Sequence, residues 1–255
     1  MPPGRILLIL ILIAAVTSPF SAQEPEVEIG DVYRVFIPVV GRVAGPAGVQ
    51  WRSTLAIYNP NRTEVFVGVT LVSTEQPLGF TLGPGQSMVI EDPVGQSFGI
   101  DALLSLLEVA SLGGAVSVGS TAWGILDDQT RTPVQDIPVL LAPLPPGVWA
   151  LNDLRQDEVF RTTLGLANFG DDAVIIRVAL QRIAGRNLAI SELTLPPRSL
   201  LHGPLEKWFP LMPEGEDLTV IVDSVSSTFY AYASVVRNSD HAGRFVLPMP
   251  AGFAP

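Results

Sequence analysis

The chain contains the same stretch of sequence twice, about 109 positions apart. Residues 51–59 read WRSTLAIYN, and residues 160–168 read FRTTLGLAN. Extended without gaps to 21 positions, the two copies share 7 of them. A shorter echo relates residues 37–40 (IPVV) to residues 137–140 (IPVL). This repeat predicts two copies of one domain of about 105–115 residues, near the commonest domain size.

Residues 1–22 have the layout of a secretory signal peptide. Arg5 gives a basic start, residues 6–16 are an unbroken apolar run, and Ser21-Ala22 offers a small-residue cleavage point. The run is shorter than the roughly 20 residues that cross a bilayer. We therefore expect a signal peptide, with an uncleaved anchor as the alternative, and no transmembrane segment in the mature chain.

The composition indicates the cellular compartment of the protein and excludes some classes of binding partner. Cysteine is absent, which excludes disulfides, thiol catalysis and Cys-based zinc sites. With a signal peptide, this favours a secreted or periplasmic bacterial protein. The net charge is −10, and loss of residues 1–22 removes one Arg and no acid. Nucleic acid and anionic membranes require a basic face, so neither is an expected partner.

The distribution of turn and strand residues predicts an all-β protein. The chain has 23 Gly and 23 Pro, and only 16% of its residues are charged. Apolar residues occupy every second position from Val65 to Leu71. This alternation predicts a half-buried strand, with Val65, Val67, Val69 and Leu71 on its buried face. About seven short strands per repeat suit antiparallel β-sandwiches, Ig-like or jelly-roll-like, in tandem after the signal peptide.

The expected boundaries follow the repeat. Domain 1 covers residues 32–141, a Pro-rich linker covers residues 142–150, and domain 2 covers residues 151–250. Residues 137–141 either finish the first domain or begin the second, and the pattern leaves this open.

Three segments give local expectations. Residues 80–82 and 87–90 flank Gly83-Pro84-Gly85 and predict a hairpin. Asp92-Pro93 resembles an N-cap with proline at the first helical position, and a turn of helix is expected at residues 204–209.

Residues 100–112 are ambiguous, because their polar residues have helical spacing. The second copy has β-branched residues at the corresponding place, Thr219 to Val222. We expect strands at residues 103–109 and 115–125, with a helix as the alternative.

These residues carry a family resemblance. Phe36-Ile37-Pro38, the loop at residues 42–45 and the strand at residues 51–60 resemble uncharacterised secreted bacterial proteins built from tandem β-sandwich domains. The turn at residues 195–197 and the strand at residues 233–236 are similar too. The resemblance implies the fold and export, and it implies neither a reaction nor a ligand.

The duplicated polar residues are candidates for a role common to both copies. Arg52 and Arg161 are expected to brace a neighbouring loop, with a ligand contact as the alternative. Asn59 and Asn168 are expected to end a strand by tolerating a left-handed turn.

The four tryptophans raise the possibility of sugar stacking. Trp51 corresponds to Phe160 and is expected in the core. Trp149 and Trp208 have no aromatic equivalent in the first copy, so they are the candidates for an exposed, ligand-binding ring.

The histidines and acids give weak catalytic signals. His202 and His241 are expected in surface loops, and no motif indicates a Ser-His-Asp site or zinc ligands. Acid pairs at residues 127–128 and 171–172 are expected in solvated turns. Glu214, Glu216 and Asp217 are weak calcium candidates, and we expect no resident metal or cofactor.

The leading hypothesis is therefore an exported, non-catalytic structural or adhesive protein of the bacterial cell envelope or exterior. Its partners are unknown, with an envelope protein or polysaccharide as the expected kind. A carbohydrate-binding module is the alternative, and a glycosidase-like hydrolase comes third.

Overall fold

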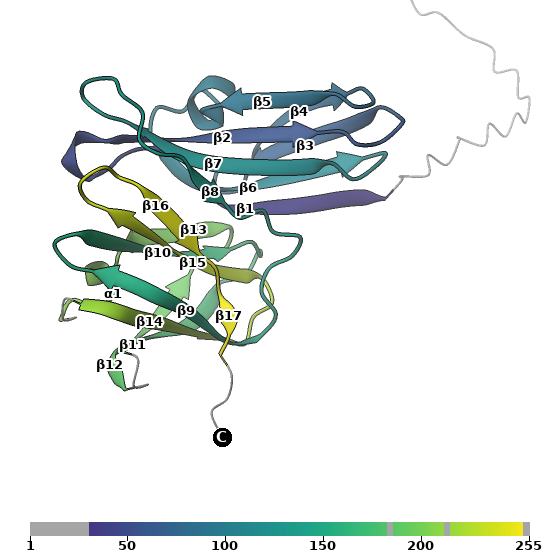
Figure 1. Cartoon of the computed structure of the whole chain (residues 1–255). Helices are drawn as coiled ribbons and strands as arrows, with labels where there is room; N and C mark the ends of the chain where they lie inside the picture. Colours follow the sequence, from purple (N-terminus) through teal and green to yellow (C-terminus); the bar gives the residue numbers. More distant parts are fainter. Residues whose placement is uncertain (1–30, 183–185, 212–214, 252–255) are drawn as a thin grey trace, which may run out of the picture.

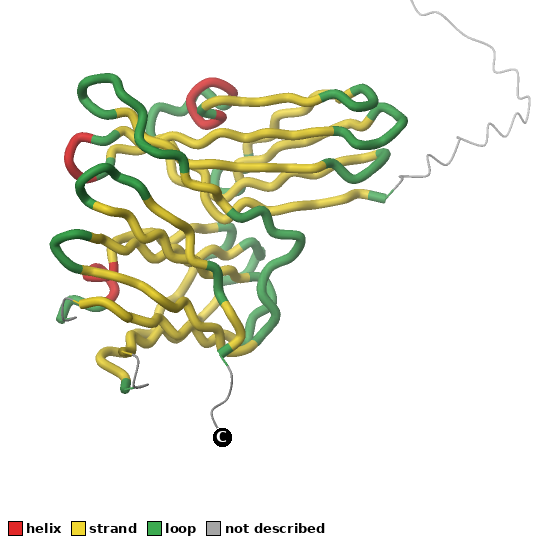
Figure 2. The backbone as a smooth tube through the Cα atoms, viewed as in Figure 1, coloured by secondary structure: helices red, strands yellow, loops and turns green. Residues whose placement is uncertain are grey.

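The structure is a computed structural model that describes residues 31–182, 186–211 and 215–251. The expected signal peptide lies outside the described residues. The all-β class is confirmed: strands fill both halves of the molecule, and in the described ranges helix is confined to three short segments (Figure 2). No helix in the described ranges has the length and apolar character that crossing a membrane requires.

The N-terminal half, residues 31–141, is a β-sandwich. Its sheet order is β4-β3-β6-β1-β2-β7-β8. β5 pairs with the edge of β2 that faces away from β7, next to the end of β1. β1 takes part in both layers, because most of its length pairs with β6 and its end pairs with β2. The strands and short helices are β1 (Val32–Ala44), η1 (Pro46–Gly48), β2 (Gln50–Tyr58), β3 (Val65–Leu71), β4 (Gln76–Leu82), β5 (Ser87–Glu91), η2 (Pro93–Ser97), β6 (Leu103–Leu112), β7 (Ser117–Ile125) and β8 (Gln135–Ile137).

The C-terminal half, residues 142–251, has two sheets, β13-β10-β15-β16 and β12-β11-β14-β9-β17. Its pairings of β9 with β14, β11 with β12 and β10 with β15 match those of β1 with β6, β3 with β4 and β2 with β7. Its elements are β9 (Gly147–Gln156), β10 (Phe160–Asn168), β11 (Val174–Arg182), β12 (Asn187–Leu195), β13 (Ser199–Pro204), α1 (Leu205–Trp208), β14 (Gly215–Ser224), β15 (Phe229–Arg237), β16 (Gly243–Val246) and β17 (Met249–Pro250).

Alternating apolar residues explain why these strands pack as layers. In β3, the side chains of Val65, Val67, Val69 and Leu71 are completely buried, while those between them face outward. Burial of such side chains contributes about 1.5–3 kcal/mol each to folding. The same pattern continues through the core of both halves.

The ambiguous segment is strand rather than helix. Residues 103–112 form β6 and residues 117–125 form β7, as the second copy indicated. Residues 135–141 belong to the first half, because β8 pairs with β7 and Leu140 bridges to Phe36. Asp92 caps η2 through Gly95 N, and α1 lies where a helical turn was expected.

The hairpin expected at residues 80–90 is wrong. β4 pairs with β3, whereas β5 pairs with β2, so the turn at residues 83–85 carries the chain between the two layers. The turn is held by Asn59, whose N–H and C=O bond to Gln86 O and Gly85 N. β4 and β5 are therefore joined by a tight turn but lie in different layers, because β4 pairs with β3 and β5 pairs with β2.

The linker expected at residues 142–150 is shorter than predicted. β9 begins at Gly147 and pairs with β14 along its length. The prolines at residues 143–146 led to the prediction of a linker up to residue 150, whereas the strand begins directly after them.

Asn59 and Asn168 do not adopt a left-handed backbone, contrary to expectation. Both side chains are fully buried. Asn59 Nδ2 donates to Leu82 O (2.9 Å) at the end of β4, and Asn168 Nδ2 donates to Pro196 O (3.0 Å) just after β12. Each amide thus ties one layer of its sandwich to the other.

The two halves pack directly against each other (Figure 1). The Phe36 and Phe169 rings lie 4.8 Å apart between centroids, and Ser234 Oγ donates to Gln135 Oε1 at 3.1 Å. Arg198 Nε lies 3.8 Å from Glu75 Oε1 at the periphery. The outer face of the sheet containing β10 and β15 is thereby covered by the edge of the first half.

Candidate functional site

The main candidate site is a cavity of about 320 Å³ between the two halves, called here the inter-half cleft. This volume is within the range of small-molecule pockets. Its walls are mostly apolar, from Val39, Leu104, Ile137 and Phe245 among others. The chemically distinctive residues at the cleft are Trp51, Arg52, Gln135, Arg161, Thr163 and His202.

The duplicated arginines meet at this cleft. Arg52 is on β2 of the first half and Arg161 is on β10 of the second, at corresponding positions of the repeat. The fold places the two strands on opposite sides of the same opening. Both arginines were candidates from the sequence, but the repeat did not predict that they line the same cavity.

Arg52 belongs to a small, partly buried charge cluster. Its Nε lies 3.3 Å from Asp92 Oδ2, and its Nη1 donates to Trp51 O at 2.7 Å. Arg42 also donates to Asp92, so two guanidinium groups share one carboxylate. The pKa of Arg52 is lowered by burial and by Arg42, while Asp92 opposes the shift. Arg52 therefore braces the η2 turn and leaves the cluster with an excess positive charge.

Arg161 is held by neutral groups. Its Nη1 donates to Asn238 Oδ1 (2.8 Å) and its Nη2 to His241 Nδ1 (3.0 Å). Burial lowers its pKa. Within residues 31–182, 186–211 and 215–251, no carboxylate forms an ion pair with Arg161. A partly desolvated cation without a counter-ion is costly unless something else supplies the charge.

The histidines are not surface loop residues, contrary to expectation. His202 lies in β13, and its Nδ1 is 2.9 Å from Tyr232 Oη. Burial, helped by Lys207, lowers the pKa of His202 to about 4. His241 is 6% exposed, and burial together with Arg161 lowers its pKa. Both rings are therefore neutral at pH 7, and each Nδ1 is already engaged.

Gln135 places an unsatisfied amide at the joint. Gln135 lies in β8 and is 3% exposed, and its Nε2 has no hydrogen-bond partner. An unpaired buried donor costs about 1–3 kcal/mol. No sequence signal marked this residue, because its environment is created by the second half.

The tryptophans differ from their expected positions. Trp208 is buried, with Nε1 donating to Gly203 O, because α1 folds its ring onto the second core. Trp149 is half-buried and donates to Pro145 O. Trp51, expected in the core, instead lies half-buried at the cleft, edge-on to His241 with 6.4 Å between ring centroids.

The acidic pairs at residues 127–128 and 171–172 lie in turns. Asp128 accepts from Thr130, which lowers its pKa, and Asp171 pairs with Arg198. Asp217 is exposed with φ 59°, Glu214 lies outside the described residues, and the side chain of Glu216 is not described. Among the residues that are described, no three acidic or His side chains gather as a metal site.

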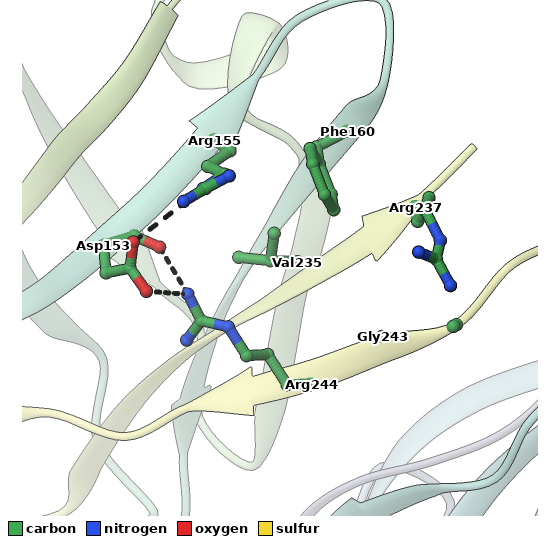
Figure 3. Close-up of a pocket in the computed structure, with 8 residues that line it drawn as sticks. Asp153, Arg155, Phe160, Val235, Arg237, Gly243 and Arg244 are labelled. Carbon is green, nitrogen blue, oxygen red and sulfur yellow. Dashed lines mark hydrogen bonds and ion pairs between the residues drawn. The ribbon is translucent and has the colours of Figure 1, made fainter. Parts of the chain in front are cut away.

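A second hollow, of about 280 Å³, lies beside β9 and β16 (Figure 3). Arg155 and Arg244 point toward Asp153, which accepts an ion pair from each. Arg237 pairs with Asp240 at 2.5 Å. These cations are exposed and already have carboxylate partners, so the hollow is a weaker ligand candidate than the cleft.

Comparisons with known proteins add little to this geometry. No family model and no curated protein matches the chain. A solved structure titled Thermotoga maritima 1070 is 15% identical, with a TM-score of 0.36, over 42% of this chain and 96% of that one. The major pilin from Streptococcus pyogenes is 10% identical, with a TM-score of 0.21, over 86% of this chain and 91% of that one. Neither likeness is strong enough to carry a functional conclusion.

Proposed function

We propose that the protein is an exported, non-catalytic structural or adhesive protein of the bacterial cell envelope or exterior, which binds its partner at the inter-half cleft. The observation that carries this proposal is the convergence of Arg52 and Arg161 on that one cavity. Two residues at corresponding places of a repeat then serve a single binding site.

The proposal includes a tandem origin for the two halves. The repeat in the sequence is supported by strand pairings that follow the same order in both halves. The corresponding side chains Asn59 and Asn168 make corresponding hydrogen bonds as well. Two copies of one sandwich, packed face to edge, create a cleft that one copy alone lacks.

Binding without turnover is favoured by the state of the histidines. A Ser-His-Asp hydrolase needs a histidine whose Nδ1–H meets a carboxylate and whose other nitrogen reaches a serine. His202 instead meets Tyr232, and His241 accepts from Arg161. Neither Nδ1 therefore has the carboxylate partner that such a triad requires.

The close packing of the two halves against each other supports a structural role. Apolar ring contact and buried hydrogen bonding between the halves predict that they move as one body. Backbone ¹⁵N relaxation of residues 23–255 should give one rotational correlation time for both halves. Two distinct correlation times would contradict the joint and, with it, the cleft.

The partner is tested by binding residues 23–255 to arrayed glycans and envelope polysaccharides, with calcium or with chelator. We expect calcium-independent binding that Arg161→Gln weakens and Arg177→Gln leaves intact, because Arg177 is exposed on β11, away from the cleft. Hydrolysis of a bound glycan would overturn the non-catalytic assignment. Export is tested by sequencing the N-terminus of the protein recovered outside the cytoplasm.

The carbohydrate-binding alternative rests on Trp51, the tryptophan at the cleft. In that case Trp51→Ala abolishes sugar binding. Trp149→Ala should have no effect, since the Trp149 indole is already bonded to Pro145 O. The reverse result would move the sugar site to Trp149.

A further inference from the structure

The inter-half cleft has a chemical character that narrows its ligand. Its walls are largely apolar, and its polar groups are two arginines, a glutamine amide and a few hydroxyl or imidazole groups. An apolar cavity with a small number of placed polar groups is the usual form of a small-molecule site.

The charge balance at the cleft is positive, although the whole protein is acidic. Arg161 has only neutral partners among the described residues, and Arg52 shares the Asp92 carboxylate with Arg42. A guanidinium in a partly desolvated setting is best satisfied by a carboxylate, whose two oxygens match its donors.

Gln135 supplies a fixed polar group in the wall of the cleft. Its Oε1 accepts from Ser234 Oγ of the other half, which holds the side chain in place. Its Nε2 is buried beside Gly243 and presents no surface to the cleft, so Arg161 carries the recognition of a ligand oxygen.

We propose that the inter-half cleft binds a small organic carboxylate with a flat apolar body, its carboxylate facing Arg161 and its body lying between Trp51 and the apolar wall. This inference rests on the proposed function, because it names the chemistry of that binding site.

Three probes of one shape test the charge requirement: 2-naphthoate, 2-naphthamide and 2-naphthamidine, which are anionic, neutral and cationic. Calorimetric titration of the mature chain should show 2-naphthoate binding at least about tenfold more tightly than the amide, since a charged hydrogen bond contributes about 1.5–3 kcal/mol. The amidine should not bind. Equal affinity for the anionic and neutral probes would overturn the proposal.

Position is tested by variants and by side-chain signals. Arg161→Gln should weaken 2-naphthoate binding about tenfold or more, Arg161→Lys less, and Arg177→Gln not at all. In ¹H–¹⁵N spectra, the Gln135 amide and the Trp51 indole should shift on binding. Should Arg161→Gln unfold the chain, the Lys variant and these spectra still decide the question. Unshifted Gln135 and Trp51 signals at saturation would place the ligand elsewhere.

Titration with methyl glucuronide, as a fourth probe, distinguishes failure of this inference from failure of the proposed function. If methyl glucuronide binds the cleft and 2-naphthoate does not, the ligand is an acidic sugar and the apolar body is wrong, although the cleft remains the binding site. If independent tumbling of the two halves shows that the cleft is absent, both proposals fail together.

Discussion

Gly165 and Tyr232 face each other across β10 and β15, and the tyrosine ring lies directly over the glycine. A Cβ atom at Gly165 would overlap this ring, which is completely buried between the second sandwich and the first half. In the first half, the corresponding pair is Ala56 and Gly119, with open space above Gly119. The two sandwiches thus have similar interiors and different outer faces.

Gly165→Ala should therefore destabilise the protein by about 1–3 kcal/mol, because the buried ring must move to admit a methyl group. Gly119→Ala is the matched control, and its free energy of unfolding should be unchanged or slightly higher. Urea unfolding of both variants measures the difference. Equal stability of the two variants would contradict the close packing of Tyr232.

Asn168→Ala should lower the free energy of unfolding by about 2–4 kcal/mol, because Pro196 O and the Asp172 carbonyl lose a buried donor. Asn59→Ala should have a similar effect in the first half. Asn187→Ala, at an exposed position of β12, should change it by less than about 0.5 kcal/mol.

A glycine at residue 168 separates the two explanations of this asparagine. A residue needed only for a left-handed turn is replaced by Gly at little cost. Because the amide itself joins the layers, Asn168→Gly should be at least as damaging as Asn168→Ala. Chemical denaturation that found the Gly variant as stable as the wild type would favour the turn explanation.

Acidification below neutrality should destabilise the protein through His202. Its pKa is about 4 when folded and about 6.5 when unfolded, so the unfolded state binds more protons between these values. Stability from this group is therefore complete above pH 6.5 and falls as pH drops toward 4, by up to about 3 kcal/mol. His202→Gln should flatten the pH dependence of the free energy of unfolding between pH 6.5 and 4.5. An unchanged slope in the variant would show that His202 is not held neutral.

Gln135→Leu should leave the free energy of unfolding unchanged or raise it by about 1 kcal/mol. The change removes an unpaired buried donor, which offsets the loss of its hydrogen bond with Ser234. Thermal and urea unfolding measure this effect. A loss above about 2 kcal/mol would show that the hydrogen bond from Ser234 outweighs the cost of the unpaired donor.

The local pattern of the sequence determined much of the secondary structure. Alternation located β3, turn residues located the ends of β2 and β10, and the second copy resolved residues 103–112 as strand. β9 was missed because the prolines just before it outweighed a short alternating segment. These outcomes reflect what local propensity and periodicity report: how a segment folds, and where it ends.

The tertiary structure alone decided which layer each strand joins and which side chains meet. The turn after β4 looked like a hairpin, yet β4 and β5 have their partners in different layers. Asn59 is buried against residues distant in the chain, His202 is half-buried beside Tyr232, and Gln135 is buried by the other half. The cleft itself exists only where one sandwich covers the edge of the other, because packing between distant segments brings Arg52 and Arg161 to the same cavity.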